Sequence, residues 1–519
     1  MTPSWALPTA NSVGSAGIDA LKLHQAPYNL TGKKIAIGQV EVGRPAQFGW
    51  DKAAQQPKFK LEQIFYQNGF AKANTNVEQH ATMVASVMIS GDKRYPGVAP
   101  GARLYASAVG LPRVAGQEEE CLSTQHVANQ NGGDVRAINL SFGEPLDRDP
   151  RVGAKLDGNA LFTQCLDWSA RVHNVMYSVA GNQGKGGISI PTDNYNGINV
   201  AYSTLRQGIY RKLDFANLSE APIGTAKSIE NREINVGNRR SIGLVAPGGN
   251  LRLYNFAGKA TLVNGTSFAA PHVTGTVALL QEFGDRQLRQ KQQLSIAVRP
   301  HWSLDARRHQ VMKAVLLNSA DKIQDAGDGL RLGMTRTLLA KNNRDWTESA
   351  VDRDRQIPLD YQLGAGQLNA FRAYQQFSPG QYSEALPVPA IGWDYRSVNT
   401  GEYRDYFLDR PVVANSWVSI TLAWDRLVEL QDTNGNGEYD LGEKFRDRGL
   451  NQLDLYLMRA DENNPDRSIW SSVSPVDSVQ HIFHQIRDPG KYKIRVYFRR
   501  AVNLPRQDYA LAWWTVPAK

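Results

Sequence analysis

The sequence GTSFAAPHVTG, residues 265–275, is the most informative part of this chain. It places Ser267 at a turn that opens a helix, and its small residues let that helix pack closely. A hydroxyl at this position lies beside free backbone N–H groups at the positive end of the helix dipole, where a developing oxyanion is stabilised. Ser267 is therefore the candidate nucleophile. The plain alternative is a Thr/Ser helix cap, with Pro271 tolerated near the helix start.

A histidine upstream of this serine heads another stretch with helical spacing. His80 opens HATMVASVMIS, residues 80–90, in which Val84, Val87 and Met88 recur on one helix face. We expect the imidazole in the first turn of a buried helix. A lone histidine in such a helix is commonly structural, but its place before Ser267 makes it the candidate general base.

The candidate acid ends a buried strand. The segment IAIGQVEVGRP, residues 35–45, is mostly apolar and carries Glu41 at its carboxyl end. A carboxylate there can hold the tautomer of an imidazole and stabilise its protonated form. Two alternatives are Gln39, which would give a weak triad, and Asp51, which lies outside the strand. A purely structural role for Glu41 is the third.

A fourth motif supplies a donor for an oxyanion. The segment NVMYSVAGNQG, residues 174–184, reads as a strand that ends in Gly181 and Asn182. The Asn182 side-chain amide, together with the backbone N–H of Ser267, could bind the oxyanion of a tetrahedral intermediate. Gly-Asn after a strand is also an ordinary turn.

Taken together, in the order acid, histidine, serine, these motifs resemble those of the subtilisin-like serine proteases, the subtilases. The connecting segments support the resemblance, since each is similar to a subtilase segment at its expected place: GVAPGARLYA (97–106), INLSFG (138–143) and VAPGG (245–249). The resemblance implies that Ser267 attacks a peptide carbonyl, His80 carries the proton, Glu41 orients His80 and Asn182 binds the oxyanion. The chain departs from the family at the acid, which is usually aspartate. The extra methylene of Glu41 requires the strand or the histidine to shift.

The resemblance also implies substrate contacts. In subtilases the stretch after INLSFG and the AGN segment line the pocket for the side chain preceding the cleaved bond. Ser141 and Gly143 are therefore expected substrate contacts. Ser189, two residues before Pro191, occupies a position whose residue often determines the specificity of this pocket in the family. Its side chain is small and uncharged. We infer a pocket open to large apolar side chains, without charge selection.

The pattern of strands and helices predicts two domains. Short apolar strands alternate with helical stretches in residues 1–376, which favours an α/β fold with a parallel sheet flanked by helices. After a linker at 377–388, residues 389–519 show alternating strands rich in tryptophan and tyrosine, typical of an all-β sandwich. That part resembles the jelly-roll domains that follow many bacterial subtilase domains. Polar, basic stretches near 206–240 and 284–308 are expected to be surface loops.

A calcium loop is predicted inside the β domain. The segment DTNGNGEYDLGE, residues 432–443, follows the twelve-residue EF-hand pattern, with Gly437 at position 6. The expected ligands at positions 1, 3, 5, 7, 9 and 12 are Asp432, Asn434, Asn436, Glu438 through its backbone carbonyl, Asp440 through water, and Glu443 as a bidentate carboxylate. Because strands flank the loop, we expect a structural Ca²⁺ site. An acidic Asn/Gly-rich turn is the alternative.

Composition narrows the classes of protein. The 519 residues are too many for one core, and no run of about 18 apolar residues predicts a membrane span. The net charge of +9 is spread along the chain without a nucleic-acid-binding motif, so we expect no nucleic-acid partner. Cys121 and Cys165 allow at most one disulfide, whose distance the sequence does not give.

The residues thus predict a serine endopeptidase that acts as a monomer on protein or peptide substrates. The start of the chain, MTPSWALPTANSVGSAG, has no basic segment followed by an apolar one, as a signal peptide would. We expect a secreted or periplasmic location, with a cytoplasmic one left open. Two further functions stay open: an inactive subtilase scaffold whose β domain binds a protein or glycan, and a peptide ligase that transfers the acyl group to an amine.

Overall fold

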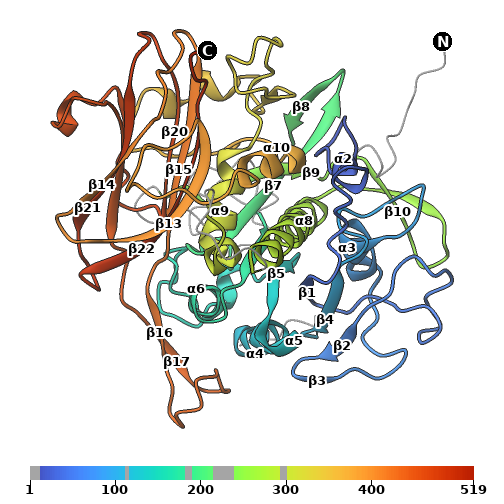
Figure 1. Cartoon of the computed structure of the whole chain (residues 1–519). Coiled ribbons are helices and arrows are strands. Elements are labelled where there is room, and N and C mark those ends of the chain that lie inside the picture. Colours follow the sequence, from blue (N-terminus) through green and yellow to red (C-terminus); the bar gives the residue numbers. More distant parts are fainter. Residues whose placement is uncertain (1–11, 111–115, 182–189, 214–238, 293–300) are drawn as a thin grey trace, which may run out of the picture.

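A parallel sheet forms the centre of the N-terminal part of the molecule (Figure 1). The computed structural model describes residues 12–110, 116–181, 190–213, 239–292 and 301–519. Within them, the sheet has ten strands in the order β12-β8-β7-β6-β5-β1-β4-β2-β3, with β9 beside β7. The strands are β1 (Ala36–Glu41), β2 (Gln63–Tyr66), β3 (Gly69–Phe70), β4 (Arg103–Ala108), β5 (Val135–Leu140), β6 (Met176–Ala180), β7 (Ile198–Arg206), β8 (Ile209–Lys212), β9 (Ile242–Pro247) and β12 (Leu338–Leu339).

Strand β1 lies in the middle of this sheet, parallel to β4 on one side and to β5 on the other. Its last residue, Glu41, pairs with Ala108 of β4, and Val40 pairs with Leu140 of β5. Strands β6, β7 and β9 continue the parallel order. Parallel strands end at one edge of a sheet, which is where α/β folds place their ligands. Glu41 therefore lies at the carboxyl edge of the sheet.

Helices cover both faces of the sheet because side chains alternate along each strand. Ile37 of β1 belongs to the hydrophobic cluster that includes α3 and α8, whereas Ala36 and Val40 belong to the cluster that includes α4 and α6. The helices of the N-terminal part are α2 (Leu21–His24), α3 (Gln79–Ile89), α4 (Gln117–Ala128), α5 (Gln130–Gly133), α6 (Leu161–Val172), α8 (Thr266–Gln292), α9 (His309–Asn318) and α10 (Ala370–Phe377). A separate hairpin pairs β10 (Leu251–Tyr254) with β11 (Ala260–Val263).

The C-terminal part is built from antiparallel β sheets, as the alternating pattern predicted. One sheet has the order β13-β22-β15-β20 and the other β14-β21-β18-β19. Val418, Ile420, Leu422 and Trp424, every second residue of β15, enter the cluster of buried side chains between these sheets. The strands are β13 (Ile391–Asn399), β14 (Tyr403–Phe407), β15 (Trp417–Trp424), β18 (Gln452–Arg459), β19 (Trp470–Ser472), β20 (Val479–Gln485), β21 (Tyr492–Arg500) and β22 (Arg506–Trp514). The jelly-roll connectivity and the boundaries at 376 and 389 remain predictions.

A hairpin arm, residues 426–448, extends from the β part to the N-terminal part along α6 (Figure 1). It contains β16 (Val428–Gln431) and β17 (Lys444–Asp447). Val428 and Tyr439 of the arm are fully buried in the cluster that covers the α4 and α6 face of the central sheet. The Gln125 side chain of α4 donates to the Tyr439 carbonyl (3.1 Å) and accepts from its N–H (2.5 Å). The arm is therefore part of the N-terminal core.

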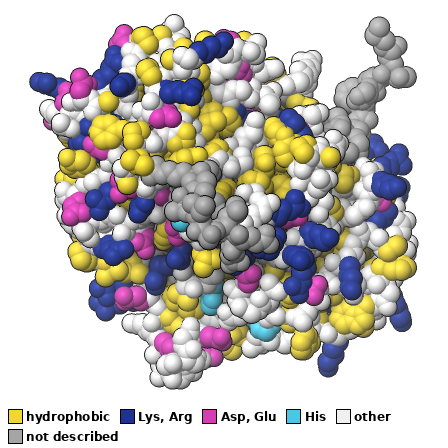
Figure 2. Space-filling model, in the orientation of Figure 1, with side chains coloured by type: hydrophobic (Ala, Val, Ile, Leu, Met, Phe, Trp, Pro, Cys, Tyr) yellow, Lys and Arg dark blue, Asp and Glu magenta, His cyan; other side chains and the backbone are white. Residues whose placement is uncertain are grey.

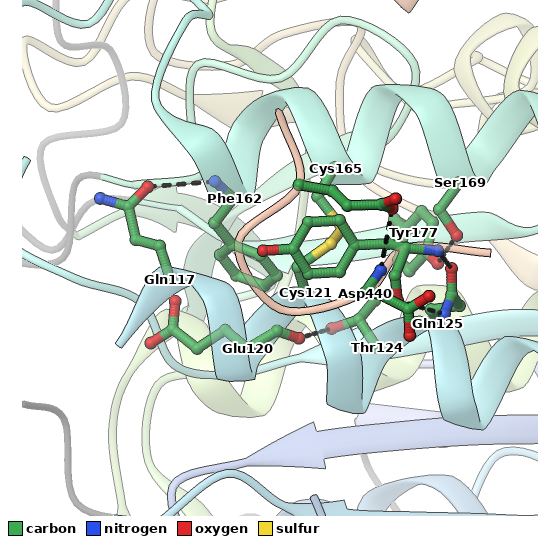
Figure 3. The surroundings of a disulfide bond; sticks show 12 residues. Gln117, Glu120, Cys121, Thr124, Gln125, Phe162, Cys165, Ser169, Tyr177 and Asp440 are labelled. Atoms are coloured by element: carbon green, nitrogen blue, oxygen red, sulfur yellow. Dashed lines mark hydrogen bonds between the residues drawn. A yellow bond between two sulfur atoms is a disulfide. The ribbon is translucent and has the colours of Figure 1, made fainter. Parts of the chain in front are cut away.

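A disulfide joins the two helices beneath the arm. Cys121 of α4 and Cys165 of α6 form the bond, with their Cα atoms 5.8 Å apart. Figure 3 shows it between the facing helices, with Gln125 and Tyr177 beside it. The structure thus answers the question that the sequence left open.

Two expected loops contain regular structure, so those predictions were wrong in part. Residues 209–212 form β8, which pairs with β7, and residues 284–292 continue α8. An ion pair between Glu282 and Arg286, one turn apart, supports this extension of α8. Polar composition hid both elements because each is only partly buried.

The surface carries a mixture of charges. On the face in Figure 2, Lys and Arg side chains are dispersed among acidic and neutral ones. Among the described residues, no helix is long and apolar enough to cross a membrane.

Candidate active site

The predicted acid and base lie together at the carboxyl edge of the sheet. Glu41 ends β1 with its side chain buried, and His80 occupies the first turn of α3. Glu41 Oε2 lies 3.4 Å from His80 Nδ1. A carboxylate on Nδ1 leaves Nε2 free to accept a proton, which is the arrangement that a general base needs.

The two alternatives to Glu41, Gln39 and Asp51, have other partners. Gln39 Nε2 donates to the backbone carbonyl of Ala81 at 2.9 Å, which ties β1 to α3 behind the histidine. Asp51 forms a bidentate ion pair with Arg44, with both N···O distances at 2.7 Å. Arg44 follows Glu41 by three residues, so this buried pair also braces the segment that carries Glu41.

The charge around His80 favours its protonated form. Burial lowers the pKa of His80, but the Glu41 carboxylate, and Glu78 with a smaller effect, outweigh burial and raise it. Glu78 also caps α3, because its carboxylate accepts the His80 N–H at 2.8 Å. Glu41 therefore stabilises the imidazolium that forms when the histidine takes a proton.

Ser267 lies in the first turn of α8, as predicted from its motif. Pro271 has no N–H, so the Ser267 carbonyl lacks its usual partner within the helix. The Ser141 hydroxyl fills that position and donates to the Ser267 carbonyl at 2.8 Å. Among the described residues, the hydrogen bond recorded for Ser267 Oγ runs to the Ser141 carbonyl at 3.4 Å, rather than to His80. The ring of His80 lies 5.5 Å from that of Phe268, next to the serine.

The end of β6 is fastened to the start of α8. The Thr266 hydroxyl donates to the Gly181 carbonyl at 2.9 Å. Asn182, the predicted oxyanion donor, follows Gly181 directly but lies outside the described residues, as does Ser189. Of the predicted substrate contacts, Ser141 and Gly143 are described, and Ser141 contacts the helix turn of the nucleophile.

The predicted calcium loop is a tight turn at the tip of the arm. Asp432 accepts backbone N–H groups from Gly435 (2.6 Å) and Gly437 (2.8 Å). Gly437 has φ +77°, the left-handed conformation that the EF-hand pattern reserves for glycine. Glu443 reaches back to the N–H of Thr433 at 2.7 Å. Backbone N–H groups lower the pKa of Asp432 and of Glu443.

The other predicted ligands also make hydrogen bonds. Inside the loop, Asp440 accepts from the side-chain amides of Asn434 (2.7 Å) and Asn436 (2.8 Å). The Glu438 carboxylate accepts from Asn129, the residue after α4 (3.0 Å). Among the described residues, no three His, Cys, Asp or Glu side chains are already grouped as a metal centre. A cation would have to exchange with these hydrogen bonds.

A model of the subtilase family matches residues 52–335, more than half of the chain. The chain belongs to the subtilase family. The matched stretch includes His80 and Ser267 but begins after Glu41, so it does not bear on the acid of this subtilase.

Curated relatives of this subtilase match over part of their length. It is 28% identical over 209 residues to Subtilisin DY of Bacillus licheniformis, covering 40% of this chain and 65% of that protein. It is 26% identical over 215 residues to Tripeptidyl-peptidase 2 of Drosophila melanogaster, covering 39% of this chain and 14% of that protein. The match thus spans less than two thirds of either relative.

Similar solved structures include the prenylagaramide maturation protease PagA, which is 20% identical to this chain. The match covers 66% of this chain and 93% of that chain, with a TM-score of 0.40. A cold adapted subtilisin-like serine proteinase has 19% identity, 60% and 89% coverage, and a TM-score of 0.37.

Sequence reasoning missed a polar cluster next to the site. Glu120 and Glu144 are buried with their carboxyl groups against each other, and Gln117 lies one turn before Glu120 on α4. The sequence shows these residues only as an acidic start of α4, GQEEE, and as a glutamate directly after Gly143. Only the fold shows that these two segments meet.

Proposed function

We propose that this subtilase is a serine endopeptidase whose orienting acid is Glu41. The observation that carries the proposal is the 3.4 Å contact between Glu41 Oε2 and His80 Nδ1, at the sheet edge where α8 presents Ser267. A subtilase with no acid on its histidine would lose about 10⁴-fold in turnover. The buried position of Glu41 supports an orienting role, because the surrounding strand fixes its side chain.

The mechanism follows from these positions. His80 Nε2 takes the proton of Ser267 Oγ as the oxygen attacks the peptide carbonyl, and the proton then goes to the leaving amine. The acyl-enzyme that results is hydrolysed by water through the same proton transfers in reverse. The Ser267 backbone N–H and the Asn182 amide would stabilise the oxyanion. For attack, Ser267 Oγ has to turn from the Ser141 carbonyl toward His80, and catalytic hydrogen bonds often tighten in this way when substrate binds.

Cleavage of casein by the purified protein tests this function. Ser267→Ala and Glu41→Gln should both abolish or nearly abolish cleavage, while Asp51→Asn is the matched control for the alternative acid. If Glu41→Gln keeps full activity, Glu41 is not the orienting acid. If the folded wild type cleaves no substrate, the inactive binding scaffold becomes the better account. Aminolysis products with an added amine would indicate the ligase.

We also propose that the loop 432–443 binds a structural Ca²⁺. The donor set suits a hard cation, since it offers carboxylate, amide and carbonyl oxygens at EF-hand spacing. Asp432 and Glu443 would hold the ion. Its positive charge would take the place of the backbone N–H groups that these carboxylates now accept. Isothermal titration with Ca²⁺, with Glu443→Gln as the comparison, tests the site.

A secreted or periplasmic location fits the disulfide, because such bonds persist in oxidising compartments. We propose that the protein acts there as a monomer. Fractionation of producing cells and sedimentation of the purified protein test these two points.

A further inference from the structure

Two buried carboxyl groups, one on α4 and one in the segment after β5, lie against each other. Glu120 is 1% exposed and Glu144 is fully buried, and none of their four carboxyl oxygens has a hydrogen-bond donor from the rest of the described chain. Burial raises the pKa of both groups, and the charge of Glu144 raises that of Glu120 further. Two carboxyls in this position share a proton and keep the remaining negative charge inside the protein.

The position of Glu144 places this pair at the predicted substrate pocket. Glu144 directly follows Gly143, an expected substrate contact. Its N–H and carbonyl exchange hydrogen bonds, each 2.9 Å, with Ile190, the neighbour of Ser189 in the chain. Glu144 therefore directly follows one expected pocket residue in the chain and is hydrogen-bonded to the residue that follows another, Ser189. Ser141, three residues earlier, contacts the nucleophile's own carbonyl.

Gln117 adds an unsatisfied donor to the same cluster. It is 3% exposed, and its Oε1 accepts the N–H of Phe162 at 3.0 Å, whereas its Nε2 has no hydrogen-bond partner among the residues that the structure describes. Gln117 and Glu120 are three residues apart on α4, so they share a helix face. Figure 3 shows the ends of both side chains projecting toward the same side of the helix.

Unpartnered groups of this kind are costly. Buried polar atoms are nearly always hydrogen-bonded, and a buried charge without a partner costs several kcal/mol. A ligand that satisfied this cluster would need a cationic head for the carboxylates and an acceptor for the Gln117 amide. A basic amino-acid residue has both, because its backbone carbonyl accepts and its side chain carries the charge.

Arg148 holds the place that such a cation would take. Its Nη1 lies 4.0 Å from Glu144 Oε1, too far for a hydrogen bond, and its side chain is 36% exposed. Arg148 therefore screens the buried charge without satisfying it. Since its side chain is partly exposed, an incoming cation would have to displace Arg148 toward solvent to reach the carboxylates.

We propose that Glu120 and Glu144, with Gln117, form an acidic subsite that binds an arginine or lysine side chain of the substrate, on the acyl side of the cleaved bond. This proposal rests on the proteolytic function proposed above. It replaces the uncharged pocket expected from Ser189, which considered a single position of the pocket. A charge-assisted contact in a buried site gives strong selection, since a neutral side chain leaves the carboxylate unpaired.

Matched peptides test the subsite. Each of the four positions before the cleaved bond carries arginine in one peptide and citrulline, its uncharged isostere, in the other. The wild type should prefer arginine at one position by about 10²-fold or more in kcat/KM. Glu120→Gln combined with Glu144→Gln should reduce that ratio to near one, because the arginine peptide then loses its charged partners. Glu119→Gln, an acid of the same helix turn, is the control and should keep the preference.

The outcomes separate this proposal from the proteolytic one. Cleavage with no preference for arginine at any position overturns the subsite and leaves the protease standing. If no peptide is cleaved, the proteolytic function fails, and titration of both peptides into Ser267→Ala still decides whether the subsite binds a cation. The glutamines remove buried charge, so the melting temperature should not fall. If the double variant does not fold, Glu144→Gln alone carries the test. Arg148→Ala should increase the preference for arginine, because it removes the competing cation.

Discussion

The ion pair between Asp167 and Arg426 joins the peptidase part to the arm, and its removal should be costly. Arg426 Nη2 lies 2.7 Å from Asp167 Oδ2, and both side chains are almost fully buried. Asp167 Oδ1 also accepts the backbone N–H groups of Tyr195 (2.9 Å) and Asn196 (2.8 Å). Asp167→Ala would leave the two N–H groups without their acceptor, and the buried guanidinium would keep only the Gly158 carbonyl (2.7 Å) and a longer contact with Asp447 (3.5 Å).

The magnitude follows from these contacts. Breaking a buried pair by removing one partner costs about 3–5 kcal/mol, and each buried N–H that loses its acceptor costs about 1–3 kcal/mol. Because these losses overlap, we expect Asp167→Ala to reduce the free energy of unfolding by about 5 kcal/mol, a large part of the 5–15 kcal/mol typical of proteins. Adding Arg426→Met should recover part of the loss, since no uncompensated charge then remains.

Urea unfolding followed by tryptophan fluorescence measures this effect. The matched control is Glu429→Ala in the same arm, which removes the 3.1 Å pair with Arg448, whose side chains are 43% and 36% exposed. The control should cost less than about 1 kcal/mol. An Asp167→Ala variant that loses no more than the control would refute the reasoning.

Three further outcomes are expected. Replacing Cys121 and Cys165 by serine removes a crosslink between residues 44 positions apart in the chain. By loop-closure entropy, this should lower the free energy of unfolding in urea by about 4 kcal/mol. An unchanged unfolding midpoint contradicts this prediction. Activity requires neutral His80, so it is lost as pH falls through the raised pKa of this histidine. Glu78→Gln removes one of the charges that raise this pKa and should move the acidic limb of the kcat/KM profile to lower pH. An acidic limb that stays in place or moves to higher pH contradicts this prediction. Calcium should raise the melting temperature of the wild type but not of Glu443→Gln, and equal shifts in both would exclude the loop as the site.

The parts of the site that depend on local sequence could be predicted. Ser267 at the start of α8, His80 in the first turn of α3 and Glu41 at the end of β1 follow from helix spacing and from the apolar strand before the acid. Each signal lies within about ten residues of the side chain that it places. The parallel order of the strands then brings their carboxyl ends to one edge.

Features that depend on distant contacts could not be predicted. Glu144 meets Glu120 only because its strand-like segment pairs with Ile190, across a long stretch of chain. Likewise, Tyr439 looks like a residue of an exposed acidic loop, yet the fold buries it against α4 and α6. Sequence spacing carries no information on which loops meet, so these contacts could not be predicted from it.

Labelling with a fluorophosphonate, followed by peptide mapping, tests the central claim most directly, because the reagent reacts with an activated serine. The account predicts labelling at Ser267 in the wild type and labelling rates that collapse in His80→Ala and in Glu41→Gln. Folded wild-type protein that stays unlabelled, or that reacts equally fast in Glu41→Gln, would contradict a Glu–His–Ser triad.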